Sequence, residues 1–215
     1  VAYKKAALLR NVNMRSTTVP DLLNKGTGFI IGFELNDEDY FIDYILKNKS
    51  GQGWAYGSGG SADPDMTGMA LYALAPYRND TRLFGGTTVK AEGTKAIEYL
   101  SQSQNDDGKF GSWGTINSCS VAQVIMGITS WGYDPQGDMF TKRNGNALTA
   151  LMSYYIGDGT FKYTSSFDPA FGTPQSLQGL LSAISYYESS DDPQMRRSTA
   201  WENIRFCGDV KQDIS

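Results

Sequence analysis

The 215-residue sequence contains no histidine and only two cysteines, and both shortages restrict the chemistry that it can perform. Histidine is the commonest metal ligand in proteins and the commonest general base near neutral pH. Cys119 and Cys207 are too few and too far apart in the sequence for a zinc cluster or an iron–sulfur site. We therefore expect no metal site. The two thiols either form a disulfide or remain free and partly buried.

Long apolar runs and an excess of positive charge are also missing. Gly, Lys, Asp or Ser interrupts every hydrophobic run before it reaches the roughly 18 residues that a membrane-spanning helix needs. The formal net charge of −4 would repel the phosphate backbone of a nucleic acid. We therefore expect neither a membrane span nor binding to nucleic acid.

The beginning of the chain indicates a portion of a larger protein. It starts at Val1, with neither an initiator methionine nor a charged-then-apolar signal segment. Its hydrophobic content of 40% suits one globular domain with a substantial core. We expect a mature or excised part of a longer chain.

What the sequence does contain is a repeat of about 50 residues, present in three copies. In each copy, an amphipathic helix precedes a glycine-rich turn, the turn ends in an aromatic residue, and a second apolar helix follows. The turn aromatics are Trp54, Phe110 and Phe161. We expect the turn glycines to adopt a positive φ and the aromatic rings to pack in the core.

Apolar residues at helical spacing predict the two helices of each copy. Met69, Gln123 and Gln178 are predicted to hold equivalent positions in the second helices. Asn36 and the pair Thr173-Pro174 are interpreted as helix starts. The buried face of the first copy's second helix is predicted to be Met66, Met69, Ala70, Ala73, Leu74 and Tyr77.

The repeats set the expected domain limits. We predict one all-α domain of helical hairpins over residues 1–200, and a C-terminal extension over residues 201–215. The clearest copies of the repeat cover residues 34–77, 88–131 and 144–188.

Over about residues 25–188, these repeats resemble the prenyltransferase and squalene-oxidase repeat. In that family a glycine-rich turn and an aromatic residue precede an inner helix of a double ring, the α/α-toroid. The stretch Ala62-Asp63-Pro64-Asp65-Met66-Thr67-Gly68-Met69-Ala70-Leu71 and the run Gln123-Val124-Ile125 look most like bacterial surface relatives of the cobalamin carriers. The resemblance implies a partial α/α-toroid, because a complete ring has about six hairpins.

The resemblance also bears on catalysis. Protein prenyltransferases of this fold hold zinc through Asp, Cys and His, a set that a chain without histidine cannot supply. Class II terpene cyclases use an Asp-x-Asp-Asp-Thr segment, which corresponds here to Asp63, Asp65 and Thr67, with Met66 in place of the third acid. The resemblance implies that Asp65 is the general acid and that Asp63 is its supporting group. The alternative is that Asp63 caps a helix beginning at Pro64.

Four further residues are candidates for ligand binding. Trp54 and Tyr72 offer π surfaces to a carbocation, or else pack in the core. Gln123 and Gln178 face the centre of the ring, or bond to a neighbouring helix end. The many aromatic side chains suit a groove for a peptide, a glycan or an isoprenoid, or else core packing.

Three functions remain open from the sequence. The first is a non-catalytic ligand-binding, partner-binding or scaffold module of a larger bacterial protein, extracellular or at the cell surface, which flanking segments of the same gene product complete. The second is a terpenoid cyclase-like enzyme with Asp65 as the general acid. The third, implied by the likeness to the cobalamin carriers, is corrinoid binding with a β domain supplied from elsewhere. No resident cofactor is expected, and cobalamin would be a ligand.

Overall fold

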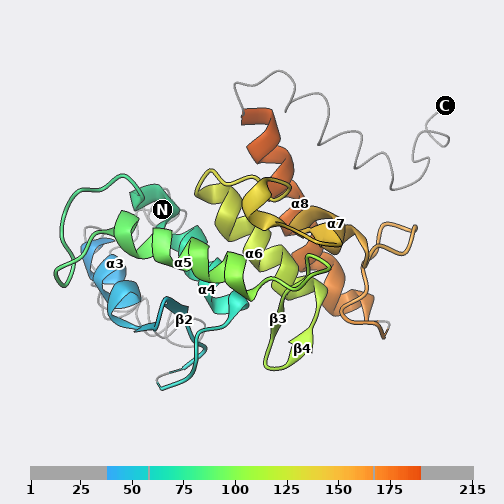
Figure 1. Cartoon of the computed structure of the whole chain (residues 1–215), viewed down its shortest axis with the longest axis horizontal. Helices are drawn as coiled ribbons and strands as arrows, with labels where there is room; N and C mark the ends of the chain where they lie inside the picture. Colours follow the sequence, from blue (N-terminus) through green and yellow to red (C-terminus); the bar gives the residue numbers. More distant parts are fainter. Residues whose placement is uncertain (1–37, 58, 167, 190–215) are drawn as a thin grey trace, which may run out of the picture. The chain divides into compact units, whose positions relative to one another are not determined.

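The computed structural model describes residues 38–57, 59–166 and 168–189 (Figure 1). Within these ranges the chain is mostly helical, as the periodicity predicts, and it also forms three small two-stranded hairpins that the all-α prediction did not include. Asn36 and the predicted extension 201–215 lie outside the described residues. The chain divides into two compact units after Lys47.

The described part of the first unit is α3 (Glu38–Lys47). Ile42 and Leu46 are buried and lie four residues apart, so they share one face of the helix. Phe41, which precedes Ile42, is exposed. The buried face of α3 is therefore narrow.

In the second unit the three hairpins each precede a helix. Their strands pair antiparallel, with Lys49 opposite Trp54 in the first hairpin and Gly111 opposite Ile116 in the second. The elements follow in the order β1 (Lys49–Ser50), β2 (Gly53–Trp54), α4 (Pro64–Leu74), α5 (Val89–Ser103), β3 (Gly111–Ser112), β4 (Thr115–Ile116), α6 (Ser118–Ser130), β5 (Thr141–Lys142), β6 (Gly145–Asn146), α7 (Ala147–Met152) and α8 (Pro169–Ser189).

The glycine-rich turns have the conformation that the sequence predicts. Gly51, Gly108 and Gly159 have φ values of 60°, 82° and 88°, in the left-handed region that glycine adopts without steric cost. The aromatic residues that end these turns are all buried; they are Trp54, Phe110 and Phe161. Both predictions are confirmed.

One prediction about the third copy of the repeat is wrong. Helix α8 begins at Pro169, and Pro174 lies inside it, so Thr173-Pro174 is not a helix start. A proline in the first helical position lacks only an N–H that would have no partner there, which explains the earlier start. The hydroxyl Oγ1 of Thr173 instead accepts a hydrogen bond from the backbone N–H of Phe161 at 3.0 Å.

The bond from Phe161 corrects the register of the repeat. In the first copy the backbone N–H of Trp54 donates to Thr67 Oγ1, also at 3.0 Å, so Thr67 and Thr173 are equivalent. Met69 follows Thr67 by two residues, and Gln175 follows Thr173 by two. Gln175 rather than Gln178 is therefore the counterpart of Met69.

The first helix of the third copy is also shorter than predicted. The copy of the repeat predicted over residues 144–188 begins with a helix, but α7 ends at Met152 after only six residues. Tyr155 instead forms an antiparallel bridge with Phe161. The strand-like pairing next to the turn competes with the helix and ends it.

Helix α6 lies in a row between α4 and α8, and α5 and α7 pack against this row (Figure 1). Small residues bring the backbones of the row into contact. A Cβ on Gly68 would lie 2.4 Å from the carbonyl oxygen of Gln123, and a Cβ on Gly127 would lie 2.8 Å from that of Gly68. On the other side of α6, a Cβ on Gly179 would lie 2.9 Å from Cα of Ala122.

This close packing decides which face of α4 is buried. Thr67, Leu71 and Leu74 are buried at the spacing i, i+4, i+7. Met69, which was predicted on the buried face, is 43% exposed. Gly68 of this helix faces α6, and in this orientation Met69 points toward solvent.

Trp131, at the C-terminal end of α6, joins three helices. Its indole Nε1–H donates to the carbonyl oxygen of Leu71 in α4 at 2.7 Å. Its six-membered ring lies over Gly93 of α5, where a Cβ would come within 1.9 Å of the ring. Gly93 is therefore needed to admit the indole.

The contact between α4 and α6 can be tested with Gly68→Ala. Alanine gains about 1 kcal/mol in helix propensity, but the added methyl group must push α6 away. We expect a net loss of roughly 1–3 kcal/mol in the free energy of unfolding, measured by urea denaturation. Gly57→Ala is the matched control, since its Cβ would meet no atom within 4 Å. Equal stability of the two variants would contradict the backbone contact.

Candidate functional site

A groove of about 790 Å³ lies between the exposed sides of α4, α6 and α8. Tyr72 comes from α4 and Met126 from α6, while Leu181 and Tyr186 come from α8. Exposed apolar side chains with polar neighbours are typical of binding surfaces. The remaining residues that line the groove are Arg78, Thr129, Ser130, Gly132, Gln178, Ser182, Ser185 and Ser189.

Hydrogen bonds fix several groups in the groove wall. The hydroxyls of Thr129 and Ser182 lie 2.8 Å apart and link α6 to α8. Ser130 Oγ donates to the carbonyl oxygen of Gly127 at 2.7 Å, and Arg78 Nη1 donates to that of Ala75 at 3.2 Å. The groove is therefore built on ordered side chains.

The polar lining of the groove consists of arginine, tyrosine, serine, threonine and glutamine side chains. Arginine stays charged throughout the physiological range. Burial raises the pKa of Tyr186 above its usual value, and the nearby charge of Asp134 adds to the effect. Serine, threonine and glutamine do not titrate. Such a lining suits the holding of a ligand better than the transfer of a proton.

The structure separates the two predicted glutamines. Gln178 lines the groove. Gln123 is almost buried, and its Nε2 donates to Oε1 of Gln175 at 3.0 Å. Gln175 was not predicted, although the threonine two residues before it, at the same place as in the first copy, is the signal that would have indicated it.

Asp63 caps α4, as the alternative interpretation of the sequence expected. Its Oδ1 accepts hydrogen bonds from the backbone N–H of Met66 at 3.0 Å and from Ser112 Oγ at 3.1 Å. Pro64 follows as the first helical residue. This carboxylate is thus committed to the helix start and to the loop that carries Ser112.

Asp65 lies in the first turn of α4 and is partly buried. Burial raises the pKa of Asp65, and the charge of Asp63 adds to it, while the hydroxyls of Ser120 and Ser112 act in the opposite direction. Its Oδ1 is buried with no hydrogen-bond partner among the described residues. Tyr72 follows at i+7, so the two residues lie two turns apart on one side of α4.

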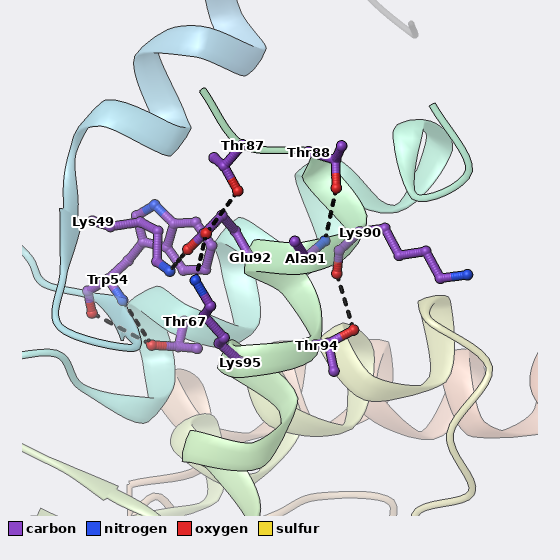
Figure 2. Close-up of polar contacts among 10 residues, drawn as sticks. All are labelled: Lys49, Trp54, Thr67, Thr87, Thr88, Lys90, Ala91, Glu92, Thr94 and Lys95. Carbon is purple, nitrogen blue, oxygen red and sulfur yellow. Dashed lines mark hydrogen bonds and ion pairs between the residues drawn. The ribbon is translucent and has the colours of Figure 1, made fainter. Parts of the chain in front are cut away.

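Trp54 lies in a buried ionic cluster rather than in the groove (Figure 2). It is only 4% exposed, and the ammonium of Lys49 lies 5.5 Å from the centre of its ring. Lys49 also pairs with the carboxylate of Glu92. The same carboxylate accepts hydrogen bonds from Lys95 Nζ at 2.8 Å and from Thr87 Oγ1 at 2.8 Å.

The described residues show neither a metal site nor a reactive thiol. They contain no group of three or more Cys, Asp or Glu placed to hold a metal ion. Cys119 is buried, and burial raises its pKa to about 11, so the thiol stays protonated. Cys207 lies outside the described residues, so the choice between a disulfide and two free thiols stays untested.

No helix in the described part of the chain is both long and apolar enough to cross a membrane. Comparison with family models, with curated proteins and with solved structures finds no match to this chain.

The cluster around Glu92 gives a pH-dependent contribution to stability. Burial alone would raise the pKa of Glu92, but the bonds from Lys49, Lys95 and Thr87 outweigh it and lower the pKa to about 2. Since this folded-state value lies below the ordinary value of 4.5, the contribution is fully present above about pH 4.5. It is lost as the pH falls toward 2.

Glu92→Gln should therefore lower the free energy of unfolding at pH 7 by about 2–3 kcal/mol, because Lys49 loses its charged partner. The difference from the wild type should narrow steadily between pH 5 and pH 2. Urea denaturation across this range measures it. Glu98→Gln, at an exposed position of the same helix, serves as the control. A difference that does not depend on pH would show that the ionised carboxylate is not responsible.

Proposed function

We propose that this chain is a non-catalytic binding module built as part of an α/α-toroid. In this proposal α4, α6 and α8 are neighbouring inner helices, and α5 and α7 belong to the outer layer. Two features support it: each of the three inner helices follows a turn that ends in a buried aromatic residue, and α6 packs against both α4 and α8. The module would belong to a larger bacterial surface or secreted protein.

The groove between α4, α6 and α8 is the observation that carries this proposal. Its apolar lining consists of two tyrosine rings, a leucine and a methionine. Its polar lining consists of hydroxyl groups, an amide and a guanidinium. A ligand with an extended apolar part and a polar or anionic end would satisfy both. Prenyl diphosphates have this character and are the first probes to use.

A second candidate function, a terpenoid cyclase-like enzyme, is favoured by Asp65. A carboxyl group whose pKa is raised by burial is closer to the protonated form that an acid catalyst needs. Asp63 would support it and Tyr72 would face the carbocation. Trp54 would contribute little, because its ring is buried beneath Lys49.

Binding in the groove is tested by titration with geranylgeranyl diphosphate, followed by calorimetry. We expect saturable binding without product, and Leu181→Ser should weaken it about tenfold, since a buried apolar side chain contributes about 1.5–3 kcal/mol. Leu177→Ser is the matched control, on the same helix but outside the groove. Equal effects of the two variants would contradict the groove as the site. Titration with cobalamin tests the corrinoid alternative.

Catalysis is tested by incubating the protein with the same diphosphate and with squalene, and by analysing the products with gas chromatography. We expect no cyclised or transferred product. If turnover is detected, the non-catalytic proposal is wrong. Asp65→Asn should then abolish the turnover, because the amide cannot supply the proton, whereas full activity of this variant would exclude Asp65 as the acid.

A further inference from the structure

Two highly exposed aromatic rings meet at the tips of two loops in the second unit. Trp113 is 76% exposed in the turn between β3 and β4, and Tyr56 is 72% exposed in the loop after β2. Their ring centroids lie 5.1 Å apart with the planes at 90°, an edge-to-face contact. The pair presents an aromatic surface to solvent.

Trp113 has a backbone conformation that tryptophan seldom adopts. Its φ is 51°, and that of the next residue, Gly114, is 75°. Two-residue hairpin turns with both φ values positive favour Asn and Gly, and a bulky residue in this region is an outlier. Because the ring is exposed, it recovers little free energy from burial. A strained backbone conformation at a residue whose side chain adds little to stability is typical of a binding site.

A polar cavity of about 750 Å³ opens beside the same turn. Gly114 and Thr115 of the hairpin line it. Its lining contains two lysines and one aspartate, which give the wall one net positive charge. Lys109 Nζ and Asp107 Oδ2 pair at 2.7 Å, which leaves the ammonium of Lys162 as the excess charge. The cavity is also lined by Lys162, Ser153, Tyr154 and Thr164.

We propose that the Trp113–Tyr56 pair and this cavity together bind an acidic oligosaccharide. Sugar rings present a C–H face that packs on aromatic rings, and hydroxyls that bond to serine, threonine and lysine. A carboxylate on the sugar complements the ammonium of Lys162. The hydroxyl and amine lining does not suit a lipid surface. No residue of this site lines the groove between α4, α6 and α8, so the two sites are independent.

Calorimetric titration tests the proposal with two probes, a tetrasaccharide of alternating glucuronic acid and N-acetylglucosamine, and the uncharged N-acetylglucosamine tetramer. We expect the acidic probe to bind at least five times more tightly. Trp113→Asn should weaken both probes at least tenfold. The same change should raise Tm by about 1–4 °C, because asparagine tolerates the positive φ. Lys162→Met should weaken the acidic probe alone.

Leu83→Ala, at another highly exposed apolar position, is the control and should leave the binding unchanged. The proposal is overturned if neither probe binds at 10 mM, a concentration about tenfold above a weak millimolar dissociation constant. It is also overturned if Trp113→Asn binds as the wild type does, or if it lowers Tm, which would assign the ring a structural role. Equal loss of both probes in Lys162→Met would contradict the acidic sugar.

Discussion

The near contact between the backbones of α4 and α6 is the constraint on which the rest of the second unit depends. Gly68 and Gly127 leave no room for side chains between the two helices, and Ala122 and Gly179 do the same between α6 and α8. Close packing of this kind fixes the distance between helices more firmly than interlocking long side chains, which have several rotamers. The groove, the cap at Asp63 and the indole of Trp131 all take their positions from it.

A second level of order comes from polar groups that join segments far apart in the sequence. Glu92 holds Lys49 beside Trp54, and so attaches the first hairpin to α5. Ser112 reaches from the β3 strand to the carboxylate at the start of α4. These buried contacts are costly to leave unpaired, so they specify one arrangement of the loops around the helix row.

Much of the helical content could be predicted from the sequence, because apolar spacing and glycine-rich turns are local signals. The positive φ of Gly108 and the burial of Phe110 follow from those signals directly. The start of α8 could not be predicted in the same way. Pro169 and Pro174 are both compatible with the first position of a helix, and the prediction placed the start at Pro174.

The candidate sites were less predictable, because they depend on contacts between elements. Periodicity assigned Met69 to the core. Instead Gly68 faces α6, and this orientation of α4 leaves Met69 exposed. The threonine before Gln175 could have indicated its place in the repeat, but its bond to Gln123, 52 residues away in the sequence, could not be predicted. Tyr72 and Gln178 were named singly, and only the packing of the row brings them to one groove.

The glycine contacts have a consequence for how such a protein can diversify. The width of the groove is set by backbone atoms where the helices touch, whereas its surface is formed by exposed side chains such as Leu181. Substitutions at these exposed positions should therefore change the surface of the groove without moving the helices. A scaffold in which the surface of a groove and the architecture beneath it are encoded by separate residues can change the first by mutation while it keeps the second.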